Sequence, residues 1–213
     1  MTSLYLLGDV FDYWFEYKKV VPKGHVRFIG KLAELVDHGI DVHLFTGNHD
    51  LWMFDYLEEE LGVKIYRHAT HFEIENTSFF IGHGDGLGPG DKSYKVIKKI
   101  FSNKLNQWLF SILHPDLGMK IMQKFSQRSR EKEMSVIDFM GPEKEWLVQY
   151  AEKKNKEQFH HFYVFGHRHL PIDFTLSNGQ SRYVNIGDWL NHFSYARFDN
   201  GQLELLKFNP LST

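Results

Sequence analysis

The chain has 213 residues, of which 42% are apolar and 24% charged, and it contains no cysteine. These values indicate a globular protein with enough length for one domain, and they exclude a disulfide framework, a thiolate metal site and a cysteine nucleophile. The formal net charge is −2, and no apolar run reaches the roughly 18 residues expected of a membrane span.

The first 90 residues alternate between strand-like and helix-like segments. An apolar run at 4–7 predicts a strand, and apolar residues at helical spacing over 26–36 predict a helix that Gly39 ends. The further elements expected are a strand at 42–45, a short helix ended by Gly62, and strands at 72–74 and 79–81. Because strands alternate with helices, this part predicts an α/β fold.

Residues 92–132 differ from the rest because lysines and arginines are mixed with aliphatic and aromatic residues. Ten basic residues stand there against two acidic ones. Pro115 and Gly118 predict a break into two or three helices. We therefore expect a helical insertion over about 92–135. Its basic charge indicates an anionic partner, an ordinary solvated surface or a dimer surface.

A helix at 143–153 and a strand at 162–165 are expected next. Beyond His169 the pattern becomes all-β, and Asn178-Gly179 and Asn200-Gly201 suit hairpin turns. The strands expected here are 171–176, 181–185, 194–198 and 203–208. The organisation predicted from the whole sequence is one domain over 1–213 that carries the helical insertion.

Four apolar runs each lead into a glycine that is followed by aspartate, asparagine or histidine. Such a glycine lets the chain turn sharply, so the next side chain can face a cleft at the carboxyl end of the strand. One carboxylate, one amide and three imidazoles favour manganese, iron, zinc or cobalt over magnesium or calcium. The predicted metal ligands are Asp9, Asn48, His83, His167 and His169.

The spacing of His167 and His169 places both on one side of the chain if the segment is extended, with Arg168 pointing away. Two metals a few ångströms apart would then each receive one of the two imidazoles. The remaining histidines that lie in or near apolar runs are expected to be structural: His43, His68, His71, His160, His161 and His192.

His49 follows a predicted ligand directly and is predicted to act on the bound phosphate. A protonated imidazole at this position would stabilise developing charge or protonate a leaving oxygen. Asp12, three residues after Asp9, is predicted to orient His49. Both residues are therefore candidate catalytic residues.

These motifs resemble the calcineurin-like metallophosphoesterase family. Its motifs G-D-x-x-D, G-N-H-D, G-H and G-H-x-H stand here at 8–12, 47–50, 82–83 and 166–169. The resemblance implies a two-sheet β-sandwich flanked by helices (α/β/β/α), with a helical cap insertion. It also implies two divalent metals, manganese first and iron or zinc as alternatives. The ligands it implies are a bridging Asp9, with Asn48, His83 and His167 on one metal and His169 on the other.

One motif of that family does not occur in the sequence, namely the D-x-H that precedes G-D. We therefore expect the first strand of the fold to be missing and the first-metal site to be weakened. Of the expected ligands of that metal, only Asp9 and His169 are present.

Within the family, segments 83–94, 126–130, 166–171 and 185–189 resemble the UDP-2,3-diacylglucosamine diphosphatases of lipid A synthesis. The resemblance implies hydrolysis of the pyrophosphate to lipid X and UMP, with the insertion capping the acyl chains. It implies a cytoplasmic protein at the anionic inner-membrane surface, with no nucleic-acid partner. The substrate contacts it implies are Asn48, Asp91, Tyr94, Ser129 and Arg130. His49 stands where many members have arginine.

Two alternatives stay open at this stage. One is another calcineurin-like phosphoesterase, acting on a nucleotide, a phosphodiester or a phosphoprotein. The aliphatic content of 92–132 is unlike the basic, aromatic groove that binds single-stranded nucleic acid. The other is a weakly active or inactive form that only binds lipid or metal.

Overall fold

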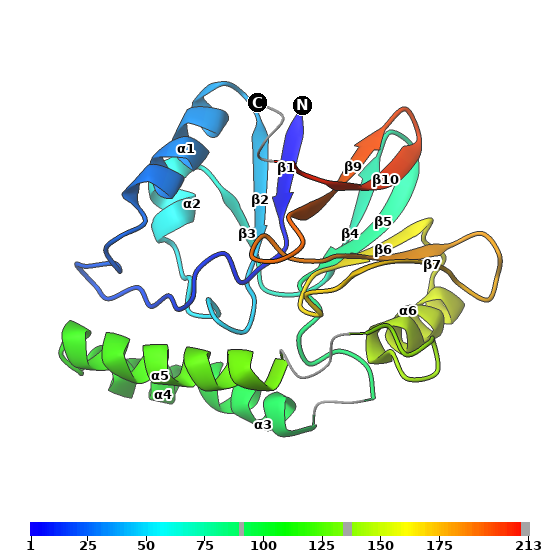
Figure 1. Ribbon diagram of the computed structural model, residues 1–213. Coiled ribbons are helices and arrows are strands. Elements are labelled where there is room, and N and C mark those ends of the chain that lie inside the picture. Colours follow the sequence, from blue (N-terminus) through cyan, green and yellow to red (C-terminus); the bar gives the residue numbers. More distant parts are fainter. Residues whose placement is uncertain (90–91, 134–137, 210–213) are drawn as a thin grey trace. The chain divides into compact units, whose positions relative to one another are not determined.

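A computed structural model describes residues 1–89, 92–133 and 138–209, with side chains in those ranges except at 92–93 and 129–133. The fold divides into two compact units (Figure 1). Unit 1 comprises 1–68 and 93–135, and unit 2 comprises 69–92 and 136–213. The predicted α/β class, with several sheets and flanking helices, is confirmed. The single domain over 1–213 stays a prediction.

Unit 1 is built on a three-stranded parallel sheet in the order β1-β2-β3. Its elements are β1 (Ser3–Leu6), α1 (Val26–Asp37), β2 (Asp41–Phe45), α2 (Tyr56–Leu61) and β3 (Lys64–Tyr66). Figure 1 shows α1 and α2 covering one face of this sheet. The apolar cluster between them includes Trp14, Leu44, Met53 and Leu57, all of which are buried. The strands are held in place by this burial, which contributes roughly 1.5–3 kcal/mol per large side chain.

Both predicted helix ends in unit 1 are confirmed. Gly39 has φ 78° and its N–H donates to the Val36 carbonyl at 2.8 Å, and Gly62 has φ 75°. A positive φ is the conformation that ends a helix and that glycine adopts without steric cost. Strand β3 was not predicted, because three residues with one apolar side chain give too short a pattern.

The predicted insertion consists of three helices, α3 (Lys92–Phe101), α4 (Lys104–Ser111) and α5 (Pro115–Glu133). They pack on the rest of unit 1 through a small apolar cluster in which Phe15, Trp52 and Met122 are buried. The Trp52 indole N–H also donates to the Phe101 carbonyl at 2.7 Å. The loop that follows β2 is therefore fastened directly to the insertion.

The predicted break at Gly118 is wrong, since this residue lies inside α5, whereas Pro115 begins the helix. A Cβ at Gly118 would approach the Phe110 ring at 3.1 Å and would also meet the Tyr17 hydroxyl. The glycine is needed for close packing of α5 against α4 and the loop after β1, and packing overrides its low helix propensity.

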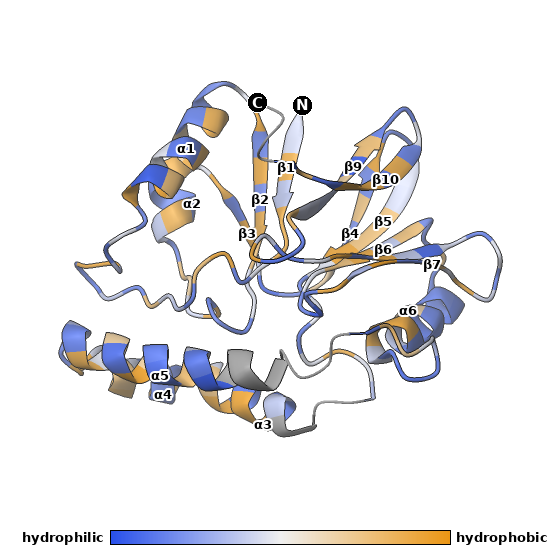
Figure 2. Cartoon of the chain, in the orientation of Figure 1, coloured by the Kyte–Doolittle hydropathy of each residue, from blue (hydrophilic) through white to orange (hydrophobic). Residues whose placement is uncertain are grey.

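The insertion carries many exposed apolar residues between its lysines, and Figure 2 shows orange segments among blue ones along these helices. They are Val96, Ile97, Ile100, Leu105, Trp108, Leu109, Ile112, Leu117 and Phe125. Exposed apolar residues gathered on one segment make it a candidate binding surface. Among the helices that the structure describes, none has both the length and the apolarity needed to cross a membrane.

Unit 2 contains a five-stranded sheet in the order β4-β5-β6-β8-β7 and a separate hairpin, β9-β10. Its strands are β4 (Thr70–Ile74), β5 (Thr77–Gly82), β6 (Phe162–Phe165), β7 (Pro171–Thr175), β8 (Arg182–Ile186), β9 (Ser194–Asp199) and β10 (Gln202–Lys207). The central strands β5, β6 and β8 are parallel, so their carboxyl ends lie at one edge of the sheet.

Helix α6 (Trp146–Glu157) packs Leu147, Val148 and Ala151 on this sheet. It begins three residues later than predicted, because residues 141–145 form a turn in which the Lys144 N–H donates to the Gly141 carbonyl at 3.1 Å. The turn between β9 and β10 is confirmed, since Asn200 and Gly201 both have positive φ, at 49° and 78°.

Candidate metal centre

Unit 1 supplies Asp9, Asn48 and His49 from the loops that follow β1 and β2. Because these strands are parallel, both loops leave the same edge of the sheet. The Asp9 carboxylate accepts a hydrogen bond from the His49 backbone N–H at 2.8 Å. A Cβ at Gly47 would lie 2.6 Å from the Asp9 nitrogen, so this close approach of the two loops requires glycine.

Asp50 holds these loops together. Its side chain is fully buried and accepts backbone N–H bonds from Gly47 at 2.6 Å and Val10 at 2.8 Å. Longer contacts run from Asp9 at 3.3 Å and Phe11 at 3.4 Å. A carboxylate that accepts several N–H bonds is stable when buried. Sequence analysis assigned Asp50 no role, although its place at the end of the G-N-H-D motif was a usable signal.

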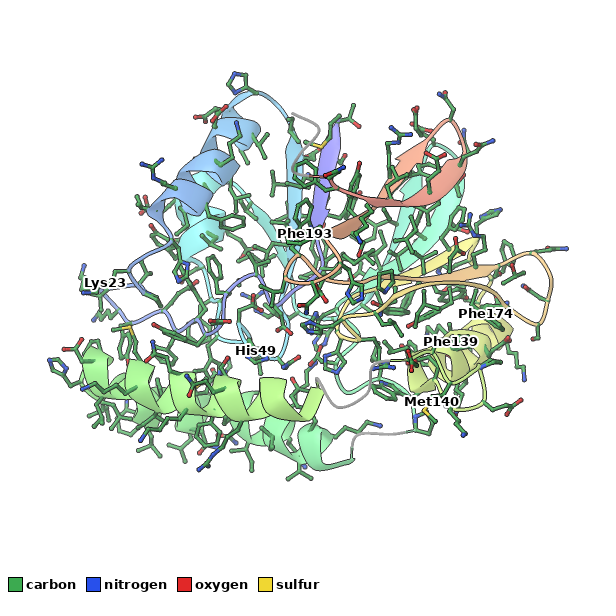
Figure 3. All side chains as sticks on the ribbon, viewed as in Figure 1. Lys23, His49, Phe139, Met140, Phe174 and Phe193 are labelled. Atoms are coloured by element: carbon green, nitrogen blue, oxygen red, sulfur yellow. The ribbon has the colours of Figure 1, made fainter. Side chains whose placement is uncertain are left out.

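His49 is only 8% exposed, and its Nδ1 lies 3.2 Å from the backbone carbonyl of Asp12. A carbonyl can only accept, so Nδ1 carries the hydrogen and Nε2 is left for other partners. Asp12 thus meets His49 through its backbone, and its side chain is exposed. Figure 3 shows His49 in the loop after β2, on the side of unit 1 where α3–α5 lie. The catalytic roles of both residues stay predictions.

Unit 2 supplies His83 and His167 from the carboxyl ends of the parallel strands β5 and β6, where Gly82 pairs with Phe165. The Gly166 N–H donates to the His83 carbonyl at 2.9 Å, which fixes the two strand ends to each other. The two imidazole rings lie with centroids 5.0 Å apart and planes at 66°. His83 is buried and His167 is half-buried, so two ring nitrogens can serve one ion.

The segment at 167–169 is not extended, so the condition for placing both imidazoles on one side of the chain is not met. His167 and His169 have φ values of 64° and 51°, and the Arg168 N–H donates to the Gly166 carbonyl at 2.7 Å. This hydrogen bond closes a three-residue γ-turn centred on His167, a conformation that costs about 1–3 kcal/mol in a residue with a side chain. The direction of His167 is therefore set by a strained turn.

A buried ion pair supports that turn. The Arg168 Nε donates to both carboxylate oxygens of Glu145, at 2.9 and 3.1 Å, and the guanidinium lies 5.0 Å from the Trp146 ring centre. Both charged side chains are buried. Charge-assisted, paired hydrogen bonds of this kind are the strong ones, and removing one partner would leave an uncompensated buried charge.

The remaining predicted substrate residues fall on or beside the insertion. Tyr94 lies on α3 and is half-buried. Asp91 lies outside the described residues, and the side chains of Ser129 and Arg130 on α5 are outside them as well. Their roles stay predictions, as do those of the five predicted ligands.

Histidines that were expected to be structural have internal partners. His43 Nδ1 lies 3.0 Å from the Tyr66 hydroxyl, and His160 Nε2 lies 3.0 Å from His71 Nδ1. Burial lowers the pKa of His43 and of His160, because a charged imidazole would lose its hydration there. Both are therefore neutral components of the fold.

The donor chemistry fits a divalent transition metal. Unit 1 offers the carboxylate of Asp9, and unit 2 offers the imidazoles of His83 and His167. Mixed oxygen and nitrogen ligands suit manganese, iron and zinc alike. An α/β fold with such donors after its parallel strands agrees with the calcineurin-like metallophosphoesterases, the class of hydrolases that the sequence motifs resemble.

Comparison with known proteins identifies the family. The chain is 39% identical over 217 residues to the UDP-2,3-diacylglucosamine hydrolase of Porphyromonas gingivalis, covering 95% of the chain and 82% of that protein. It is 28% identical over 212 residues to the enzyme of the same name from Edwardsiella ictaluri, covering 96% and 79%. The chain belongs to the family of UDP-2,3-diacylglucosamine hydrolases. No family profile matches it.

Solved structures give a weaker likeness. A predicted phosphoesterase from Streptococcus pneumoniae has a TM-score of 0.39 and 14% identity, covering 85% of this chain and 86% of that one. Vps29 with zinc from Entamoeba histolytica has a TM-score of 0.38 and 11% identity, covering 97% of each chain.

Proposed function

We propose that the chain hydrolyses the pyrophosphate bond of UDP-2,3-diacylglucosamine and releases lipid X and UMP, a step of lipid A synthesis. The observation that carries the proposal is the 39% identity, over 95% of the chain, to a relative of that name. The strand-end side chains support it, because they are the donors that metal-dependent phosphoryl chemistry needs.

The proposed metal ligands are Asp9, Asn48, His83, His167 and His169, and the proposed metals are two divalent ions, manganese first. When bound, such ions supply Lewis-acid stabilisation of phosphoryl oxygens and a water of lowered pKa. Two of these ligands, Asp9 and His83, are held by hydrogen bonds within their own unit. In unit 1 the contacts are the hydrogen bonds to Asp9 and Asp50, and in unit 2 they are those between Gly166 and His83.

His49 is the proposed catalytic side chain. Its Nδ1 is engaged by the Asp12 carbonyl, so its Nε2 is directed to the phosphate and stabilises the charge that develops on a leaving oxygen. Because His49 is nearly buried, this interaction is little weakened by water. Asp12 acts as a positioning residue through its backbone.

The helices α3–α5 form the proposed cap over the acyl chains. They are fastened to the loop after β2 by the Trp52–Phe101 hydrogen bond and by the apolar cluster around Phe15. The cap therefore lies next to the loop that carries Asn48 and His49. The proposed polar substrate contacts are Asn48, Asp91, Tyr94, Ser129 and Arg130.

The exposed side of the cap is the proposed contact with the anionic inner-membrane surface. Lys95, Lys98 and Lys99 flank exposed Val96 and Ile100 on α3. Basic residues near an anionic lipid surface contribute about 1 kcal/mol each. In a flotation assay with anionic vesicles, Lys98→Glu with Lys99→Glu should reduce binding by one to two orders of magnitude. Lys153→Glu with Lys156→Glu on α6 is the matched control. Equal flotation of both double variants would refute the proposed membrane contact of α3.

The reaction is tested by incubating the purified chain with UDP-2,3-diacylglucosamine and Mn²⁺ and measuring UMP. The expected result is UMP release that chelation abolishes and that His167→Ala reduces by at least two orders of magnitude. His161→Ala, a histidine of the same sheet paired with Ser78, is the matched control and should retain activity. Turnover of simple phosphodiesters without UMP release would instead favour another phosphoesterase activity.

A further inference from the structure

The loop at 187–193 begins at the same sheet edge as His83 and His167. Strand β8 is parallel to β6, with Phe165 opposite Asn185, so Gly187 follows a strand end as Gly166 does. The side-chain amide of Asn185 also donates to the Gly166 carbonyl. Trp189 and His167 therefore both follow strand ends at this edge of one sheet.

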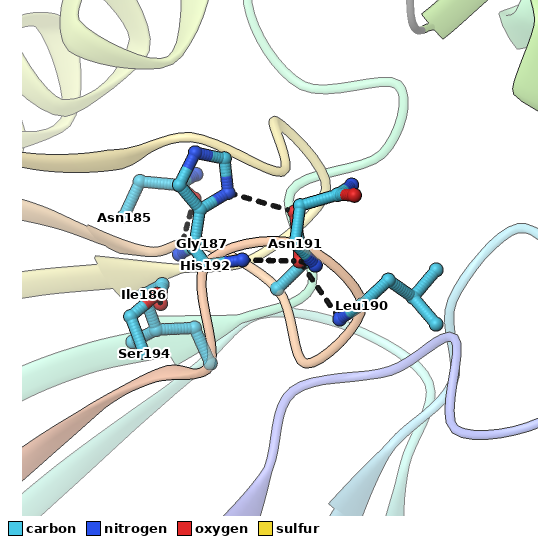
Figure 4. A network of polar contacts seen from close by, with 8 residues as sticks. Asn185, Ile186, Gly187, Leu190, Asn191, His192 and Ser194 are labelled. Carbon is cyan, nitrogen blue, oxygen red and sulfur yellow. Dashed lines mark hydrogen bonds and ion pairs between the residues drawn. The ribbon is translucent and has the colours of Figure 1, made fainter. Parts of the chain in front are cut away.

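Asp188 gives this loop a fixed shape (Figure 4). Its Oδ1 accepts N–H bonds from Leu190, Asn191 and His192 at 2.8, 2.6 and 3.1 Å, and its Oδ2 lies 2.9 Å from His192 Nδ1. Burial opposes ionisation of Asp188, but the N–H of Asn191 and the side chain and N–H of His192 outweigh it and lower its pKa to about 2. The carboxylate is therefore ionised and holds the loop at neutral pH.

The loop presents an aromatic ring that is not used by the fold's core. Trp189 is 56% exposed, although its ring lies 5.6 Å from the ring of Phe208, 6.4 Å from Tyr195 and 6.5 Å from Phe193. An indole that is supported by other rings yet open to solvent is a preorganised stacking surface, because little side-chain entropy remains to be lost on binding. Two residues on, Asn191 is exposed and uses its backbone N–H for the turn.

Resting on the proposed function, we propose that Trp189 and Asn191 bind the uracil ring of the lipid-nucleotide substrate. Every nucleobase has a flat π-face that stacks on an aromatic side chain. Uracil also presents two carbonyl acceptors and one N–H donor on its edge, and the asparagine amide offers a donor and an acceptor that match them. Trp189 stacks on the uracil ring, the Asn191 amide forms hydrogen bonds with the edge of the ring, and Asp188 positions both residues.

The test measures UMP binding to the whole chain by titration calorimetry in the presence of Mn²⁺. Trp189→Ala should weaken UMP binding about 5- to 150-fold, Trp189→Phe should weaken it less, and Asn191→Ala should weaken it a few-fold. Trp108→Ala is the matched control, since Trp108 is 59% exposed but lies on α4, and its UMP affinity should be unchanged. Ribose 5-phosphate, which lacks the base, should bind wild type and Trp189→Ala equally.

The inference is overturned by no UMP binding in wild type, by equal UMP affinity in wild type and Trp189→Ala, or by an equal loss of ribose 5-phosphate affinity in that variant. A loss confined to vesicle flotation also overturns it and assigns Trp189 to lipid. The proposed reaction is judged separately by UMP release. If UMP binds in a base-dependent way but no hydrolysis is measured, the uracil site is supported and the proposed reaction is refuted. If hydrolysis is measured and Trp189→Ala leaves it unchanged, only the uracil site is refuted.

Discussion

Asp50→Ala tests whether one buried carboxylate organises the metal-binding loops of unit 1. In the native chain its oxygens accept the N–H groups of Gly47 at 2.6 Å and Val10 at 2.8 Å, with two longer contacts. Alanine leaves both close donors without this acceptor, the Gly47 N–H buried and the Val10 N–H partly buried. Each such donor costs about 1–3 kcal/mol, so we expect a loss of about 3 kcal/mol in the free energy of unfolding.

For a chain of this size that loss corresponds to a Tm lower by about 6–12 °C, which a domain of ordinary stability survives at 25 °C. The assay is thermal unfolding followed by circular dichroism, with Mn²⁺ affinity measured by calorimetry at 25 °C. Because the His49 N–H bond to Asp9 depends on the same loops, Mn²⁺ affinity should fall at least tenfold while the protein is still folded.

Asp37→Ala is the matched control, since Asp37 is an exposed aspartate of the same unit and a surface change of this kind stays within about 0.5 kcal/mol. If Asp50→Ala and Asp37→Ala had the same Tm and the same Mn²⁺ affinity, the carboxylate would not be the organising group. A lower Tm with unchanged Mn²⁺ affinity would limit Asp50 to a stabilising role.

Two further predictions concern stability. The pKa of Asp188 is lowered to about 2, so its carboxylate stabilises the fold above pH 4, and this contribution is lost as the pH falls from about 4 to about 2. In Asp188→Asn, the free energy of unfolding should therefore change less with pH over this range. The difference from wild type is on the order of 1–2 kcal/mol after solvent screening. Gly118→Ala should lower the free energy of unfolding by about 1–2 kcal/mol because its Cβ meets the Phe110 ring, whereas Gly30→Ala, with nothing within 4 Å, should raise it by about 0.5–1 kcal/mol. Urea unfolding curves of the two glycine variants would contradict the packing argument if both shifted in one direction.

The order of strands and helices was predictable because hydrophobic periodicity and glycine at element ends are local signals. Gly39 and Gly62 end helices as expected, and Asn200-Gly201 forms the expected turn. Gly118 was misread because the same residue type serves a different purpose there. Its missing side chain lets α5 approach Phe110, and that partner is known only once the helices are packed.

The type of metal ligand at the site was also predictable in part, because the residues that follow each apolar run can be identified from the sequence. What could not be predicted is which polar residue supports which loop. Asp50 contacts a loop 40 residues earlier in the chain, and Glu145 contacts Arg168 across 23 residues. Both are buried carboxylates that satisfy groups distant in sequence, and no local pattern distinguishes them from solvated acids.

The backbone conformation of the proposed ligands points to how the site is kept ready for metal. Asp9, His167 and His169 all have φ between 51° and 64°, which residues with a side chain seldom adopt. Such strain persists only where surrounding contacts over-determine it. For Asp9 those contacts come from Asp50, and for His167 from the paired Arg168 and Glu145. The free energy that fixes the donor directions therefore comes from carboxylates outside the proposed ligand set, so substitutions at these supports should weaken metal binding while every proposed ligand remains in place.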